Sequence, residues 1–152
     1  MSDQWKSHLK SLGSVLGQAT RTATDVAKDL SRAVAQELGA VRCLQSYSVE
    51  GQVCTAGPGG LWRVYAAKAR KPDAPHPTVS VWVLTKRQAA DLDSQQGLSS
   101  GQQVSTRAEA YFANARRGFA LAQRLQHPGL LRVVEPLEET RSQLVAVTEP
   151  IS

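Results

Sequence analysis

Residues 78–84 read TVSVWVL, an alternating run rich in β-branched residues that is typical of a strand with one covered face. The same alternation recurs on both sides of this run along the chain. Gly57–Gly60 supplies a turn between two earlier runs, and the polar residues 138–141 supply another between two later ones. The predicted strands are Tyr47–Val49 with Val53–Thr55, Leu61–Ala66, Thr78–Leu84, Leu130–Val134 and Gln143–Thr148.

One helix is predicted between the third and fourth strands. Thr106 and Glu109 have the spacing of a capping box, which opens a helix. His127-Pro128 ends it, because the residue before a proline disfavours helical backbone, so the helix is expected to run to about Gln126. Its apolar residues recur with helical spacing, which predicts one face packed on the sheet.

The remaining segment of this half of the chain, residues 86–104, is rich in Gln, Ser, Gly and Asp and has no sustained apolar period. It is predicted to be a long exposed loop with at most a short helical turn near residues 87–92. The order of three strands, a helix and two strands predicts an α+β fold, in which one helix crosses a five-stranded antiparallel sheet.

Residues 1–40 differ from the rest in their apolar periodicity. We expect them to form an amphipathic helical segment preceding a folded domain of residues 44–152. Apolar residues recur every three or four positions from Trp5 onward, as on one face of a helix. Two interpretations stay open: a helix packed within the protein or in a coiled coil, or a helix lying in a membrane surface. In the second, the inserted face would be Trp5, Leu9, Leu12 and Leu16.

Composition excludes several classes of protein. A chain of 152 residues fits one domain with an appendage, not a large multidomain enzyme. The net charge of +5 comes from scattered basic residues, so no nucleic-acid partner is expected. Cys43 and Cys54 have no histidine at ligand spacing, which predicts reduced thiols in a cytosolic protein and no metal site.

Four landmarks appear in the order found in the small N-terminal lobe of a protein kinase, which this part of the chain resembles. Gly57-x-Gly59 followed by Val64-Tyr65 resembles the glycine-rich loop, and Val79–Trp82 resembles the Val-Ala-Ile-Lys strand. Residues 125–128, LQHP, resemble the end of the lobe's helix, and residues 147–150, VTEP, resemble the last strand and the hinge.

The departures from the kinase pattern indicate lost catalysis. The resemblance places Trp82 where a kinase has its phosphate-binding lysine, and Gly118 where the helix has the glutamate that pairs with that lysine. Trp62 stands at the third glycine of the loop, so Gly57, Gly59 and Gly60 would form a vestigial nucleotide loop. No catalytic residue, metal or cofactor is expected, and ATP binding is expected to be lost.

The end of the last predicted strand resembles the start of the hinge that joins the two lobes of a kinase. Thr148 takes the gatekeeper position, Glu149 is the first hinge residue, and Pro150 has no N–H to donate. The chain ends at Ser152 without the later kinase motifs, so we expect either a fragment of a longer protein or a free-standing small lobe.

An aromatic residue at the lysine position, a helix with Arg117-Gly118-Phe119 and the closing Thr148-Glu149-Pro150 are together similar to the SCY-like (SCYL) pseudokinases, in particular their branch associated with clathrin-coated vesicles. This resemblance implies a scaffold in membrane traffic, peripheral on Golgi, trans-Golgi network and endosomal membranes. It implies clathrin or adaptor coat proteins as partners.

Two further expectations follow. If the strand register differs from that assumed, Lys68 or Lys86 would replace the missing lysine, and the full-length protein would be an ATP-binding kinase. A small lobe without its large lobe should also expose an apolar patch near Phe119, Leu125 and Val133.

Overall fold

The computed structural model describes residues 41–95 and 101–151, together with Arg32 and Gln36. The predicted helical segment 1–40 and its apolar face of Trp5, Leu9, Leu12 and Leu16 therefore lie outside the described residues, apart from positions 32 and 36. The elements are α2 Cys43–Ser46, β1 Tyr47–Ala56, the 3-10 turn η1 Pro58–Gly60, β2 Trp62–Ala69, β3 Thr78–Thr85, α3 Lys86–Gln95, α4 Gly101–Arg124, β4 Val133–Glu139 and β5 Gln143–Thr148.

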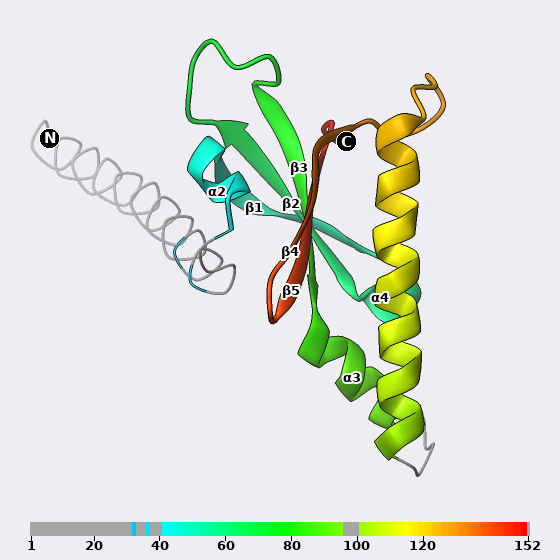
Figure 1. Ribbon diagram of the computed structural model, residues 1–152. Helices are drawn as coiled ribbons and strands as arrows, with labels where there is room; N and C mark the ends of the chain where they lie inside the picture. Colours follow the sequence, from blue (N-terminus) through cyan, green and yellow to red (C-terminus); the bar gives the residue numbers. More distant parts are fainter. Residues whose placement is uncertain (1–31, 33–35, 37–40, 96–100, 152) are drawn as a thin grey trace, which may run out of the picture.

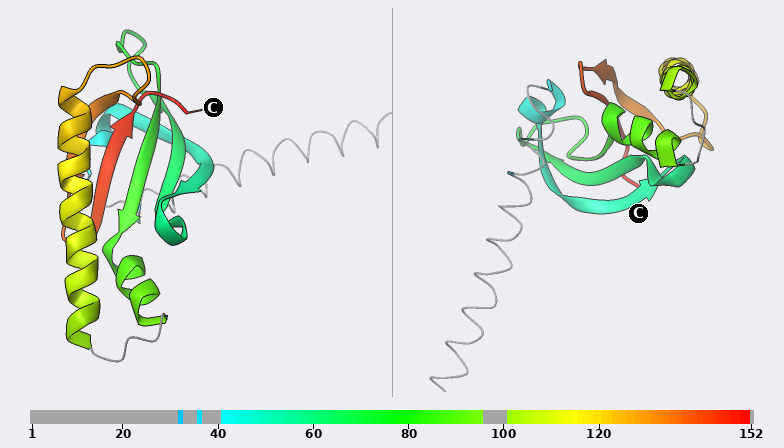
Figure 2. Two further views of the ribbon diagram at one scale, coloured as in Figure 1. Left: turned by 90° about the vertical axis from the view of Figure 1, so that its right-hand side faces the viewer. Right: turned by 90° about the horizontal axis from the view of Figure 1, so that it is seen from below.

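The five strands form one antiparallel sheet in the order β1-β2-β3-β5-β4 (Figure 1). Strand β3 is central, and its register places Trp82 between Val64 of β2 and Ala146 of β5. Helix α4 runs along one side of this sheet, with α3 beside its N-terminal half (Figure 2). The predicted α+β fold with a helix across a five-stranded sheet is confirmed, and α3 is an additional helix.

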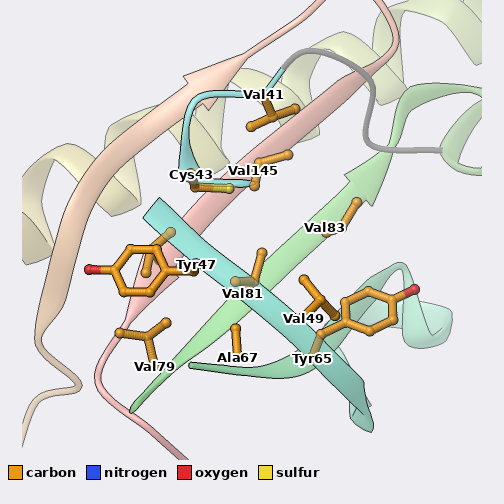
Figure 3. Close-up of a cluster of buried hydrophobic side chains, with 11 residues drawn as sticks. Val41, Cys43, Tyr47, Val49, Tyr65, Ala67, Val79, Val81, Val83 and Val145 are labelled. Atoms are coloured by element: carbon orange, nitrogen blue, oxygen red, sulfur yellow. The ribbon is translucent and has the colours of Figure 1, made fainter. Parts of the chain in front are cut away.

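The alternation of the strands divides the buried side chains between two clusters. The cluster on the side away from α4 is rich in valine from β1, β3 and β5 and also includes Val41 and Cys43, which hold the chain entering the sheet (Figure 3). Burial is the main cause that raises the pKa of the Cys43 thiol, to about 12, so this thiol stays protonated and unreactive. The cluster facing the helices contains Trp62, Leu84, Ala89, Ala108, Phe112 and Leu144.

The prediction that residues 86–104 form a loop with at most a short helical turn is wrong for residues 86–95 and 101–104, which are helical. Helix α3 begins at Lys86, directly after β3, and α4 already begins at Gly101. Ala89 explains the first of these helices, because it is buried among Leu84 and Phe112 while its neighbours Arg87 and Gln88 face solvent. Tertiary packing of Ala89 thus helps to sustain a helix whose own apolar pattern is weak.

The capping box also does not open the long helix. Helix α4 starts five residues before Thr106, so Thr106 lies inside it, and the Glu109 carboxylate instead accepts a bond from Arg116 at 3.1 Å. The helix ends at Arg124, close to the predicted end, and Leu125 N–H still donates to Leu121 O at 3.0 Å.

Strand β4 is shifted along the chain from its predicted place. It occupies Val133–Glu139 instead of 130–134, so half of the predicted turn 138–141 belongs to the strand. Pro136 concealed this strand in the sequence, because proline cannot donate to a ladder. It is tolerated here because β4 is at the edge of the sheet, with register shifts on both sides of Glu135.

Among the described residues, no helix combines the length and the apolar character needed to cross a membrane.

Candidate functional site

The candidate site lies on the α4 side of the central strands, around Trp82. Strand alternation places this half-buried indole among the residues that face the helices. Its Nε1–H donates to Thr148 Oγ1 at 2.9 Å, and that hydroxyl donates to the carbonyl oxygen of Glu149 at 2.9 Å. The indole is therefore tied to the last strand by a chain of two hydrogen bonds.

A second indole, that of Trp62, lies between Trp82 and helix α4. Its ring centroid is 6.5 Å from that of Trp82 in an edge-to-face arrangement and 5.5 Å from that of Phe119. Its Nε1–H donates to the hydroxyl of Tyr111 at 2.9 Å, and its side chain is only 6% exposed. Such aromatic pairs add to the free energy of apolar burial, so Trp62 joins the sheet to the helix.

The glycine turn closes over the Trp62 indole. Gly57, Gly59 and Gly60 all have left-handed backbone, with φ of 76°, 62° and 67°. A Cβ on Gly57 would lie 2.9 Å from Trp62 Cδ1 and 3.0 Å from the Tyr111 hydroxyl oxygen. Glycine is needed here for the approach of the turn to a tryptophan and a tyrosine of its own chain.

Gly118 leaves space on the helix instead of filling it. A Cβ at this position would meet no atom within 4 Å. The residue lines a cavity of about 400 Å³ with Trp62, Tyr111, Phe119 and other small residues of α4. The structure thus brings Trp62 and Gly118 to one cavity, whereas Trp82 is not part of its lining.

The predicted hinge residues are engaged with neighbouring strands. Ile151 N–H donates to Ser80 Oγ at 3.0 Å, so the residue after Pro150 is joined to β3. Glu149 and Arg132 are doubly linked: Glu149 N–H donates to Arg132 O at 2.9 Å, and Arg132 N–H donates to Glu149 Oε1 at 3.0 Å. The backbone N–H groups of Glu149 and Ile151 are therefore satisfied within the chain.

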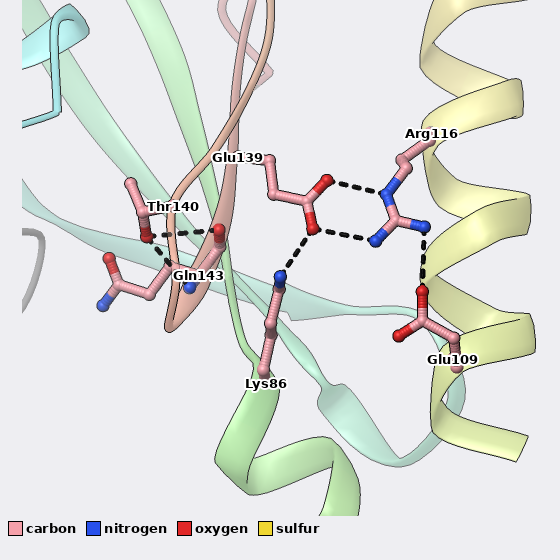
Figure 4. A network of polar contacts seen from close by, with 6 residues as sticks. All are labelled: Lys86, Glu109, Arg116, Glu139, Thr140 and Gln143. Atoms are coloured by element: carbon pink, nitrogen blue, oxygen red, sulfur yellow. Dashed lines mark hydrogen bonds and ion pairs between the residues drawn. The ribbon is translucent and has the colours of Figure 1, made fainter. Parts of the chain in front are cut away.

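Lys86, one of the two proposed substitutes for the lysine, belongs to an ion network. Its ammonium contacts Glu139 of β4 at 2.5 Å, and the same carboxylate accepts two bonds from the Arg116 guanidinium, at 2.7 and 2.8 Å (Figure 4). Hydrogen bonds from Arg116 first, and from Lys86 second, lower the pKa of Glu139 to about 2. The network joins the end of β3 to β4 and α4.

Lys68, the other substitute, lies on the same sheet face as Trp82 but near the far end of β2, opposite Thr78. Its ammonium pairs with Glu50 at 2.6 Å, and both side chains are exposed. The two lysines thus each have a carboxylate partner, and they lie near opposite ends of β3, because Lys68 is opposite Thr78 and Lys86 follows Thr85.

Several residues of this site were not found from the sequence. Tyr111 and Ser80 hold Trp62 and Ile151, but a tyrosine beside an apolar stripe and a serine inside a strand carry no motif. Glu139 was assigned to a turn because Pro136 hides the strand. The assignment of Trp82, Trp62 and Gly118 to kinase positions, and of Thr148, Glu149 and Pro150 to the hinge, stays a prediction from the resemblance.

Within the described ranges, no cluster of three or more histidine, cysteine or acidic side chains could hold a metal ion.

Comparisons with known proteins agree with the resemblance. The chain is 28% identical to human SCY1-like protein 2 over 140 residues, which is 91% of this chain and 13% of the human protein, and the mouse protein matches equally. It is 33% identical over 92 residues to the protein kinase domain-containing protein ppk32 of Schizosaccharomyces pombe, which covers 60% of this chain and 11% of that protein. The chain therefore spans a small part of the length of these relatives.

Among solved structures, Rad53 1-466 in complex with AMP-PNP matches with a TM-score of 0.41 and 18% identity, over 72% of this chain and 22% of that one. No protein-family model matches the chain. The sheet order and the crossing helix are those expected of a kinase-like small lobe, and the sequence matches confirm the predicted resemblance of this chain to the SCY-like kinase-like proteins.

Proposed function

We propose that this chain is the small lobe of a pseudokinase, a kinase-like domain that binds other proteins and has no phosphoryl-transfer activity. The observation that supports this most directly is the state of Trp82. At the position that the resemblance assigns to a phosphate-binding lysine, an indole is hydrogen-bonded to Thr148 and packed edge-to-face on Trp62.

The missing lysine charge sets the size of the expected loss in nucleotide affinity. A lysine on a phosphate contributes a charge-assisted hydrogen bond of roughly 1.5–3 kcal/mol, which an indole cannot supply. Phosphoryl transfer depends on positioning and on neutralising the developing charge, so catalysis should fall further than binding. Gly118 likewise has no carboxylate with which to anchor a cation.

The polar backbone groups of the predicted hinge and of Ile151 support the same proposal. The N–H of Ile151 is donated to Ser80, and the carbonyl of Glu149 accepts from Thr148. A nucleotide base that needed these groups would have to break existing hydrogen bonds, which removes most of the gain from forming new ones.

The proposed role is that of an interaction module in clathrin-linked traffic between Golgi and endosomes, with coat proteins as partners. Its support is the similarity to SCY1-like protein 2 over 91% of the chain, together with the resemblance to the coated-vesicle branch. Contact with a membrane through residues 5–38 is a compatible part of this proposal. Sedimentation with anionic liposomes tests it, and the double variant Leu12→Asp/Leu16→Asp should then lose binding.

Thermal unfolding with Mg-ATP tests the pseudokinase proposal. A ligand that binds only the folded state raises Tm, so the wild-type chain should melt at the same temperature with and without millimolar Mg-ATP. The variant Trp82→Lys/Gly118→Glu reintroduces the ion pair and should respond more than Val53→Lys, which adds a lysine at an exposed position of β1. A clear rise in Tm of the wild-type chain would contradict the proposal.

The alternative of an active kinase with a relocated lysine has no specific support, because Lys86 is held by Glu139 and Lys68 by Glu50.

A further inference from the structure

A second cavity lies at the end of the sheet where the β2–β3 loop meets α2 and β4. Its volume is about 810 Å³, within the range of sites that hold small ligands. The lining comes from the α2–β1 junction (Gln45, Ser46, Tyr47), from Ala69 and loop residues 71–76, and from Val134 and Glu135 of β4. None of these residues belongs to the candidate site around Trp82, Trp62 and Gly118.

Glu135 supplies the charge on the inner wall of this cavity. The side chain is half-buried and makes no hydrogen bond or ion pair with any residue in the described ranges. Burial first, and the nearby Glu138 second, raise the pKa of its carboxyl group. Glu138 cannot relieve it, because that carboxylate accepts the Arg42 N–H at 2.9 and 3.2 Å and is itself negative.

The other charges around the cavity do not compensate Glu135. Lys71 and Asp73 line the cavity, are exposed and are opposite in sign, so together they add no net charge. His76 is half-buried on the loop. A cation that entered would therefore meet a desolvated carboxylate with no competing partner.

We propose that this cavity binds an arginine side chain of a protein partner, with its guanidinium on the Glu135 carboxylate. The planar guanidinium matches a carboxylate in two parallel hydrogen bonds and is more weakly hydrated than an ammonium, so it loses less on entering a partly buried site. The apolar stem of arginine suits the walls made by Ala69, Val134 and the Tyr47 ring. This cavity shares no lining residue with the candidate site around Trp82, and the proposal does not depend on the loss of nucleotide binding.

Titration of the full chain with N-acetyl-argininamide, followed by amide NMR, tests this site. We expect saturable shifts at Tyr47, Ala69, Val134 and Glu135, and none with N-acetyl-citrullinamide, which has the same shape without the charge. Glu135→Gln should weaken binding about tenfold or more, because the ion pair is lost. Asp73→Asn removes an equal charge from the rim of the same cavity and should change the affinity less than about twofold.

Three results would overturn the proposal: no saturable shift with argininamide at millimolar concentration, equal binding of citrullinamide, or equal losses in the two variants. Equal binding of N-acetyl-lysinamide would overturn the choice of arginine. Glu135→Gln is nearly isosteric, and its Tm and its amide spectrum without probe verify that the variant is folded.

Discussion

At the scale of single residues, the hydrogen bond between Trp62 and Tyr111 holds the two sides of the site together. Tyr111→Phe removes the acceptor and leaves a buried indole N–H without a partner, which should lower the free energy of unfolding by about 1–3 kcal/mol. Urea unfolding measures this. The matched control is Tyr65→Phe, whose hydroxyl makes no hydrogen bond within the described ranges and whose loss should cost less than about 0.5 kcal/mol. Equal costs for the two variants would contradict this role of Tyr111.

The stability of the protein should depend on pH through Glu135, because this carboxylate is half-buried and has no hydrogen-bond or ion-pair partner in the described ranges. Its pKa is raised in the folded state, so the folded chain holds the proton more tightly than the unfolded chain does. The stability of the wild-type protein should therefore gain from this group as pH falls through the raised pKa, and the gain should be complete below the ordinary glutamate pKa. Glu135→Gln should be more stable than wild type at pH 7, with the difference shrinking as pH falls. A variant less stable than wild type at pH 7 would contradict this account of its burial.

At the scale of elements, Glu139 joins β4 to α4 and to the start of α3. The pKa of its carboxyl group is lowered to about 2, so its contribution to stability is present above the ordinary glutamate pKa and is lost as pH falls toward 2. Glu139→Gln should lower Tm at pH 7, and its Tm should converge with that of wild type near pH 2. The exposed Glu50, which pairs with Lys68, provides the control Glu50→Gln, for which the Tm change should be smaller. A constant difference between Glu139→Gln and wild type from pH 7 to pH 2 would contradict the ionic role of this network.

The elements that the sequence predicted well are those whose burial follows a simple period. Strands β2, β3 and β5 alternate because one row of each contacts the helices and the other row contacts the valine cluster, and their predicted bounds are close to those observed. Helix α3 was missed because its helicity depends on packing of Ala89 in a cluster that includes Phe112 of α4, which is distant in sequence. The predicted bounds of β4 were wrong because its edge position, which tolerates Pro136, is a property of the whole sheet.

The same limit applies to the site. The sequence pointed to Trp62, Trp82 and Gly118, because each replaces a residue type that a recognisable motif requires. It could not point to Tyr111, Ser80 or Glu139, because each acts through a partner at least 23 residues away along the chain. Partners of that kind are set by strand order and helix position, which no local pattern encodes.

At the scale of the whole molecule, the end of α4 and the loop after it expose apolar side chains. The predicted patch near Phe119, Leu125 and Val133 is partly confirmed: Leu125 is 55% exposed, whereas Phe119 and Val133 are half-buried. Leu121 and Leu130 are also exposed. We predict concentration-dependent association of the chain, measured by sedimentation velocity, that Leu121→Gln/Leu125→Gln reduces. If the wild-type chain associates and the double variant associates equally, the contact lies elsewhere on the surface.

The central claim is that Trp82, hydrogen-bonded to Thr148 and packed on Trp62, belongs to a site that takes no nucleotide. The sequence contains three tryptophans, so the indole N–H of Trp82 can be assigned in NMR spectra by Trp82→Phe, with Trp62 as an internal reference. The account predicts that the Trp82 indole and the Ile151 amide resonances stay unchanged up to millimolar Mg-ATP, because their bonds to Thr148 and Ser80 persist. A saturable shift of both resonances on adding Mg-ATP would show a nucleotide at this edge of the sheet and would contradict the account.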